Sequence, residues 1–197
     1  YIKHAVLDNG GDNSIAETLR WCRNIKIINL GWNNITDEQL LPKVDAITGE
    51  YHSDELILCR NRIGNAGCHA LATLLADTNC NLKHLNLDNN RIGNEGATAI
   101  ANSLANNNKL MRLDLEENPI DPSVLGIFCT VLCNTSSVND TYHSNHTLDT
   151  LVGPRHANLL STLLKMNEEK NKSHVAIRKT LKYHSNIDME PLFEWDS

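Results

Sequence analysis

The amino-acid sequence predicts an α/β repeat protein in which strand–helix units stack side by side. Three observations lead to this fold class: an asparagine that recurs at a fixed period, a ladder of alternating aliphatic residues in phase with it, and a stripe of small and aliphatic residues at helical spacing between the ladders. The recurring residues stand 28, 29 and 28 residues apart: Asn33, Asn61, Asn90 and Asn118. A unit of this length cannot bury its own apolar face, so stacked neighbours have to supply the core.

The strands are predicted from the aliphatic ladder. In the unit from Leu82 to Leu104, the sequence LKHLNLDNNRIGNEGATAIANSL follows the pattern L-x-x-L-x-L-x-x-N-x-I and continues into a helical stripe. Alternation buries every second side chain of a strand and turns the others outward on one shared face. Ser53 interrupts the ladder, whose members are Ile25, Ile28, Leu30, Ile35, Leu56, Leu58, Ile63, Leu82, Leu85, Leu87, Ile92, Leu110, Leu113, Leu115 and Ile120.

The helices are predicted near residues 65–77, 94–106 and 121–133. Gly67, Ala70, Leu71 and Leu75 of one unit recur in the next as Gly96, Ala99, Ile100 and Leu104, and this spacing places each set along one helix face. We expect the small residues to let each helix approach the sheet. The amide of each recurring asparagine can satisfy backbone groups in the bend that follows its strand.

With these residues identified, the chain from Ile25 to about Leu132 resembles the ribonuclease-inhibitor-like subfamily of leucine-rich repeats. Units in this subfamily have 28 or 29 residues and a full α-helix. The resemblance implies a curved α/β leucine-rich-repeat solenoid with a parallel sheet on the concave face and helices on the convex face. We therefore expect parallel, fully buried strands around Ile28, Leu56, Leu85 and Leu113.

We divide the chain into an N-terminal capping segment (1–24), the repeats (25–153, four clear and a fifth degenerate) and a C-terminal helical cap with a tail (154–197). Before Ile25, the sequence SIAETLRW predicts a helix that closes the N-terminal end. In the degenerate unit, Val138, Thr141 and His143 keep the ladder phase, and His146 replaces the recurring asparagine.

Two helices are predicted after residue 154. PRHANLLSTLLKMNEE has Pro in its first turn and places Leu159, Leu160, Leu163 and Leu164 on one side, while SHVAIRKTLKYH begins with Ser173 as the expected N-cap. A solenoid needs a terminal element to cover its last apolar surface, so we interpret this region as a cap. The alternative is a basic partner-binding helix, with IDMEPLFEWDS as core or docking peptide. Its cations are Lys170, Lys172, Arg178, Lys179 and Lys182.

Charge and hydropathy limit the possible partners. The net charge of −6 arises from the repeats, because residues 1–153 hold 11 basic and 18 acidic groups. An acidic body repels phosphate backbones, so we expect no nucleic acid and favour a protein partner with a basic surface. No stretch approaches the ~18 apolar residues of a membrane span, and the first residues lack a secretory apolar region. We therefore expect no membrane insertion and a cytoplasmic location, unless a targeting signal precedes Tyr1.

The six cysteines are interpreted as reduced structural thiols, since Cys68 and Cys129 fall where a neighbouring repeat has Ala97 and Ala101. A metal site built from Cys129, Cys133, His143 and His146 is the less favoured alternative, because the two cysteines have the spacing of one helix face. The sequence has no nucleophile elbow, phosphate loop or paired-carboxylate signature, so we expect no enzyme and no cofactor.

Five N-x-S/T sequons, at Asn34, Asn134, Asn139, Asn145 and Asn171, raise the alternative of a secreted glycoprotein. Asparagine makes up 26 of the 197 residues, so composition alone accounts for several matches.

The favoured function is a non-catalytic protein–protein interaction module that binds through the concave face and rim, because a solenoid offers a preformed surface. The outward residues form three columns and a rim: Ile27, Glu55, His84 and Arg112; Asn29, Ile57, Asn86, Asp114 and Tyr142; Gly31, Cys59, Asp88 and Glu116; and, at the rim, Trp32, Arg60, Asn89 and Glu117. The candidate partner-binding residues are Trp32, Arg60, Glu55, Ile57, His84, Asn86, Asp88, Arg112, Asp114, Glu116 and Tyr142.

Trp32 with Arg60 is the preferred anchor, because these residue types are enriched at interface hot spots. Packing of Trp32 against the N-terminal segment is the alternative interpretation. Two other functions stay open: a regulator of an enzyme such as a small GTPase, which rests on fold-level resemblance, and an architectural subunit of a larger assembly.

Overall fold

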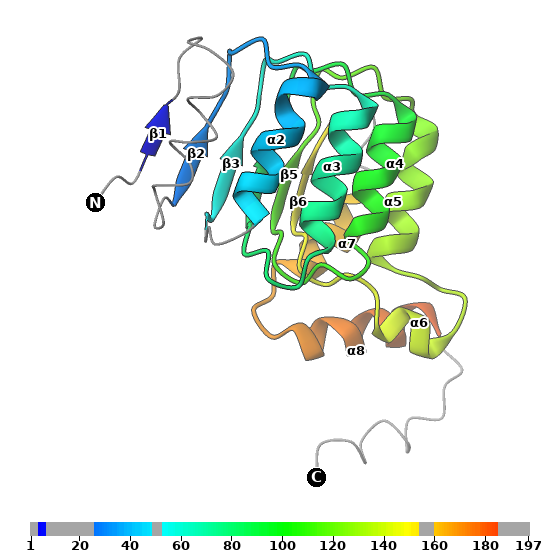
Figure 1. Ribbon diagram of the computed structural model, residues 1–197. Helices are drawn as coiled ribbons and strands as arrows, with labels where there is room; N and C mark the ends of the chain where they lie inside the picture. Colours follow the sequence, from blue (N-terminus) through cyan, green and yellow to red (C-terminus); the bar gives the residue numbers. More distant parts are fainter. Residues whose placement is uncertain (1–3, 7–25, 49–52, 154–159, 185–197) are drawn as a thin grey trace.

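The structure is a computed structural model that describes residues 4–6, 26–48, 53–153 and 160–184 (Figure 1). Within these residues, six short strands form one parallel sheet, and their order in the sheet is their order in the chain. The helices of the repeats lie together on one face of this sheet (Figure 1). The strands are β1 (His4–Val6), β2 (Ile27–Asn29), β3 (Glu55–Ile57), β4 (His84–Asn86), β5 (Arg112–Asp114) and β6 (Thr150–Val152).

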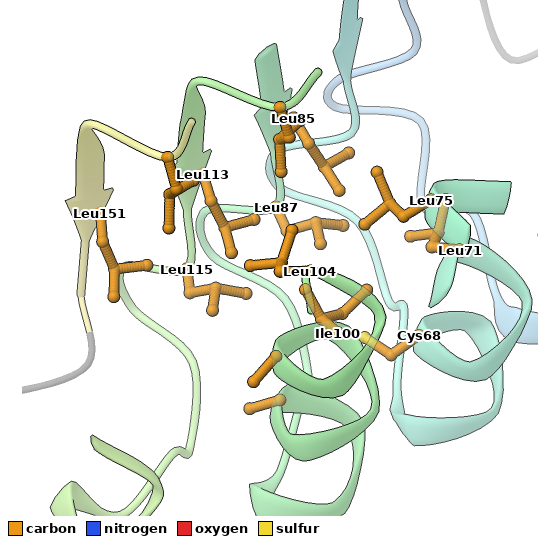
Figure 2. Packing of buried hydrophobic residues seen from close by; sticks show 14 of the residues in the cluster. Cys68, Leu71, Leu75, Leu85, Leu87, Ile100, Leu104, Leu113, Leu115 and Leu151 are labelled. Carbon is orange, nitrogen blue, oxygen red and sulfur yellow. The ribbon is translucent and has the colours of Figure 1, made fainter. Parts of the chain in front are cut away.

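Each repeat buries one aliphatic residue at the same point of the sheet. The central residues of β2 to β5 are direct partners across the sheet and are at most 1% exposed: Ile28, Leu56, Leu85 and Leu113. The prediction of four parallel, buried strands is therefore confirmed. Ser53, which interrupts the ladder, is also buried. In Figure 2 the strand leucines face a group of helix side chains, Cys68, Leu71, Leu75, Ile100 and Leu104.

The three predicted helices are present, with ends that differ by a few residues. They are α3 (Asn65–Ala76), α4 (Asn94–Ser103) and α5 (Leu125–Leu132), and α5 follows a 3₁₀ turn, η1 (Pro122–Val124). The Asp121 carboxylate caps this turn by accepting a hydrogen bond from the Ser123 N–H at 2.8 Å. A further helix, α2 (Asp37–Thr48), occupies the same place in the first repeat, where the sequence pattern did not predict one.

Glycines near the helix starts allow neighbouring helices to approach one another. A Cβ atom on Gly96 would lie 3.1 Å from the Cα of Asn65 in α3, and a Cβ on Gly67 would lie 2.6 Å from Asp37 Oδ1 in α2. The expectation that these small residues serve the helix–sheet contact is thus corrected, because their closest neighbours lie mostly on the preceding helix.

The recurring asparagines join each bend to the repeat before it. Asn90 Nδ2 donates to the carbonyls of Leu58 and Leu87, both at 3.0 Å, and Asn90 Oδ1 accepts from the Ile63 N–H at 3.1 Å. Asn61 and Asn118 make the equivalent bonds one repeat earlier and one repeat later. The predicted backbone-satisfying role of these amides is confirmed.

A second series of bonds joins the helix starts in the opposite direction along the chain. Asn65 Oδ1 accepts from the N–H groups of Gly93 and Gly96 at 2.9 and 3.1 Å, at the start of the following helix. Asp37 Oδ1 accepts from the Gly64 N–H, and Asn94 Oδ1 from the Asp121 N–H, both at 2.7 Å. Each repeat therefore supplies acceptors to both of its neighbours.

We expect Asn90→Ala to lower the free energy of unfolding by about 1–3 kcal/mol, because buried backbone groups lose their partner. Urea denaturation followed by circular dichroism measures this change. Asn108→Ala is the matched control, since Asn108 is exposed, and it should change stability by less than about 0.5 kcal/mol. Equal effects of the two substitutions would contradict the proposed role of Asn90.

The first strand lies before the part of the chain in which we predicted repeats. β1 pairs with β2 in the parallel register, with Ala5 opposite Ile28, so the sheet begins within the segment interpreted as an N-terminal cap. The helix predicted from SIAETLRW lies outside the described residues. The boundary between residues 24 and 25 stays a prediction.

The predicted phase of the fifth unit is wrong. Val138 and Thr141 belong to the short helix α6 (Val138–Tyr142), and the strand is formed instead by β6, whose Leu151 pairs with Leu113 and is buried. The segment before β6 is longer than in the other repeats, and Ser137 Oγ caps α6 by accepting from the Asp140 N–H. The expected repeat length therefore placed the ladder in this inserted helix.

The C-terminal cap consists of α7 (Ser161–Asn167), which packs against α5, and α8 (Lys172–Tyr183), which packs against α6 and α7. The predicted leucines Leu160, Leu163 and Leu164 are buried, while Leu159 lies outside the described residues, as does IDMEPLFEWDS. The N-cap of α8 is Asn171 rather than Ser173, because the Asn171 side chain accepts from the His174 N–H.

Candidate protein-binding face

The outward residues of the strands form the aligned columns that the sequence predicts. In the first column Glu55, His84 and Arg112 are direct partners on β3, β4 and β5, and in the second column Ile57, Asn86 and Asp114 are partners on the same strands. Arg112 is exposed and the other five are half-buried. Two residues that the sequence analysis missed, Thr150 and Val152 on β6, extend the two columns by one position.

A signal for this missed strand is present in the sequence. Asn107 and Asn145 each stand three residues before a buried ladder leucine, Leu110 or Leu148. In both cases the asparagine Oδ1 accepts from the N–H of that leucine. An N-x-x-L motif therefore marks the start of the strand even where the repeat length changes.

The second column also stabilises the ends of the strands. Asn29, Asn86 and Asp114 each accept, through a side-chain oxygen, the N–H of the residue two positions later at 3.0 Å. This side-chain turn explains why short polar residues recur at this position. One acceptor on each of these side chains is therefore already engaged by the protein's own backbone.

The rim residues share an uncommon backbone conformation. Trp32, Arg60, Asn89 and Glu117 have φ values of 63°, 54°, 54° and 50°. Residues other than glycine rarely adopt this left-handed region, although Asn does so more readily. Backbone bonds between neighbouring repeats hold it, because the N–H groups of Trp32, Arg60 and Asn89 donate to carbonyls of the next repeat at 2.8–2.9 Å.

Trp32 and Arg60 form a cation–π pair on this rim. The Arg60 Cζ lies 4.3 Å from the centroid of the Trp32 ring, and Trp32 is 67% exposed. This exposure supports the interpretation of Trp32 as a surface anchor over its packing against the N-terminal segment. A guanidinium that stacks on an exposed indole adds attraction of about 0.5–1 kcal/mol and orders both side chains.

An acidic cluster continues the rim beyond Arg60. It consists of Asp88 on the third column together with Asp114, Glu116 and Glu117 at the end of β5. Burial raises the pKa of Asp88, and the negative charges of Asp114 and Glu117 raise it further, whereas Arg60 opposes the shift. The rim therefore changes from aromatic and cationic to anionic along the solenoid.

The opposite ends of the strands carry a smaller charged group. Asp54 accepts from Lys83 at 2.9 Å and from Lys26 at 3.1 Å. The hydrogen bond from Lys83 is the main cause that lowers the pKa of Asp54, and Lys26 adds to it. These contacts neutralise Asp54, so negative charge gathers at the rim.

Tyr142 does not belong to the concave face. The sequence analysis placed it in the second column, but it ends α6 and its ring makes an edge contact with His143 at 5.4 Å between centroids. Val152 takes the position in the column, because the strand follows the inserted helix.

The thiols and histidines provide no reactive group on this face. The cysteines in the described residues, Cys59, Cys68, Cys80, Cys129 and Cys133, are free, and burial raises the pKa of each, to about 12 for Cys68. Thiols of this kind are weak nucleophiles at neutral pH. No group of three or more metal-ligating side chains occurs in the described part of the chain.

Two hollows lie beside the cap helices rather than on the sheet. One of about 490 Å³ lies between α5, the following loop, α7 and α8, and the other of about 460 Å³ lies between α7 and α8. They share Thr162 and Lys182 in their linings. No helix of the described residues is long and apolar enough to cross a membrane.

Comparison with known proteins agrees with this architecture. A family model for the leucine-rich repeat matches residues 22–38 and 78–101. The fold is an α/β leucine-rich-repeat solenoid with a parallel concave sheet, convex helices and a C-terminal helical cap.

Two solved structures are similar to the chain over most of its length. Leiomodin-1 actin-binding site 2 has a TM-score of 0.60 and 18% identity, covering 93% of this chain and 95% of that one. The tropomodulin C-terminal domain of Caenorhabditis elegans has a TM-score of 0.62 and 15% identity, covering 85% of this chain and 97% of that one. No curated protein is significantly similar to the chain in sequence.

Proposed function

We propose that the chain is a non-catalytic protein–protein interaction module that binds its partner through the concave face and rim. The main support is the exposed Trp32–Arg60 pair, which lies in line with the acidic cluster on one surface. Bonds between repeats hold this surface in place, so binding orders few additional groups. The period of 28 or 29 residues and the full helices α3 and α4 support a unit of the ribonuclease-inhibitor-like kind.

The charge distribution favours a partner with a basic segment. Asp88 is half-buried among like charges, so a cation placed beside it relieves repulsion as well as forming a contact. The same cluster disfavours a phosphate backbone. An aromatic or acidic group on the partner would complement the Trp32–Arg60 pair.

Actin is the first partner to test, because a structure named as an actin-binding site shares the fold over 95% of its length. The test is co-sedimentation with actin filaments together with calorimetric titration of monomeric actin. We compare the intact chain with the double variant Trp32→Asn/Arg60→Asn. Asparagine is chosen because Asn89 already adopts the left-handed conformation at the equivalent position.

The double variant should weaken binding at least tenfold, since hot-spot residues contribute about 2 kcal/mol or more. Asn102→Ala on the convex helix α4 is the control and should bind like the parent, because Asn102 is exposed on the opposite face. If actin does not bind, cross-linked partners captured from the native source take its place. Equal capture by the parent and the rim variant would contradict the proposed surface.

Two other functions are distinguished by the same material. An architectural subunit should associate or aggregate when isolated, whereas a binding module should elute as a monomer in gel filtration. A regulator of an enzyme such as a small GTPase should change nucleotide turnover when added to it. The free thiols in the described residues support a reducing, cytoplasmic location.

A further inference from the structure

One lysine of the cap is buried without a counter-ion. Lys179 on α8 has no exposed surface, although the sequence alone places it in a run of cations. No carboxylate of the described residues forms an ion pair with it. A buried ammonium needs polar partners to replace its water, so its contacts decide how firmly α8 is held.

Three acceptors surround the Lys179 ammonium. Nζ donates to the carbonyl of Leu132 at 2.6 Å and to the carbonyl of Asn145 at 3.0 Å, and it lies 3.2 Å from His146 Nδ1. Leu132 is the last residue of α5, where the helix dipole favours a cation. One side chain of the cap thus joins the end of the last repeat helix to the segment that leads into β6.

The contact requires a neutral His146. Its Nε2 lies 2.8 Å from the Tyr142 carbonyl, which can only accept, so Nε2 carries the hydrogen and Nδ1 presents its lone pair to Lys179. A second proton on the ring would sit on Nδ1 and point at the ammonium. The closed arrangement therefore holds one positive charge, whereas separated side chains can hold two.

The surroundings offer nothing to offset that second charge. The titratable groups that act on this pair are Cys133 from α5, His143 after α6, and Lys172 on α8, and none of them is an acid. Lys172 is held by the Asn167 carbonyl, and His184 by Thr141 Oγ1 at 2.7 Å. In the described residues, the buried oxygens Asn167 Oδ1 and Thr180 Oγ1 have no hydrogen-bond partner, which lowers the stability of the closed cap.

We propose that the Lys179–His146 contact is a proton-operated latch: protonation of His146 breaks the three-acceptor arrangement and releases α8 from the last repeat. Release would uncover the apolar end of the solenoid, which includes Leu132 and Leu148. The latch is independent of the partner proposed for the concave face.

The direction of the pH effect follows from both groups. Burial, with a contribution from Lys179, lowers the pKa of His146 from 6.5 to about 4, so closure is favoured above pH 6.5 and is lost as pH falls towards 4. Burial lowers the pKa of Lys179 to about 7, so closure strengthens further as pH rises from about 7 towards 10.5. Acid therefore opens the latch, and its open fraction can grow up to about tenfold per pH unit in the His146 window.

Hydrogen exchange of the full chain at pH 7.5 and pH 5.0 tests the latch, after correction for intrinsic rates. Protection of α8 relative to α4 should fall by roughly tenfold or more at pH 5.0. His146→Gln keeps a neutral acceptor that does not titrate here, so its α8 should lose this dependence on pH. His143→Gln is the matched control: His143 is exposed, and the dependence should remain.

The histidine resonances give a second measurement that needs no variant. In the intact protein the His146 ring should titrate below pH 5 while α8 remains docked. A ring that titrates near pH 6.5 with α8 still protected would overturn the proposal. So would equal acid-induced loss of protection in the parent and in His146→Gln.

Discussion

Deleting residues 154–197 should lower the melting temperature markedly and make the remaining solenoid self-associate. Leu160, Leu163 and Leu164 are buried in the intact protein, and their loss uncovers the last repeat, including Leu132 and Leu151. Burial of each leucine contributes about 1.5–3 kcal/mol, so loss of the three should cost on the order of 5 kcal/mol. The exposed end forms an apolar patch that favours association. Calorimetry and analytical ultracentrifugation measure the two effects.

The matched control ends the chain after His184, which removes only residues 185–197. This shorter deletion should leave the melting temperature and the monomeric state nearly unchanged, because the cap helices remain. An unaltered melt after the larger deletion, together with ready proteolysis of residues 165–197 in the intact protein, would show that the region is a mobile arm for a partner.

Leu85→Ala should lower the free energy of unfolding by about 2–5 kcal/mol. Leu85 is 1% exposed, pairs with Leu56 and Leu113 in the sheet, and lies among helix side chains from α3 and α4 (Figure 2). The stacked repeats on both sides limit collapse around the void, so most of the cavity should remain. Urea denaturation of the parent and the variant measures the loss.

Met111→Ala is the control for this substitution, because it also shortens an apolar side chain but at a position that is 38% exposed. It should cost less than about 1 kcal/mol. A loss below about 1 kcal/mol for Leu85→Ala itself would show that the buried phase of the ladder is misassigned.

The sequence was sufficient for the repeats because two independent periods agree within them. The aliphatic alternation sets which strand residues are buried, and the recurring asparagines such as Asn90 fix where each strand ends. It failed at the fifth unit, because the inserted helix α6 changes the spacing without removing the ladder pattern. β1 was missed because three residues are too few to show a period.

The candidate site was predictable as a set of columns but not in its chemistry. Alternation placed His84 and Arg112 on one face, and the structure pairs them directly. The left-handed rim and the contact of Arg60 with Trp32 depend on bonds between repeats, which a single sequence does not show. Lys179 was indistinguishable from exposed lysines, since its acceptors lie 47 and 34 residues earlier in the chain.

The two series of side-chain bonds between repeats set rules for lengthening or shortening this solenoid by design. Asn90 serves the bend of the repeat before it, while Asn65 serves the helix start of the repeat after it. A cut at any repeat boundary therefore orphans backbone amides on both new faces, and grafting a foreign end would have to replace both sets. Duplicating one whole period copies both asparagines together, so an inserted copy arrives with the acceptors that its two new neighbours require.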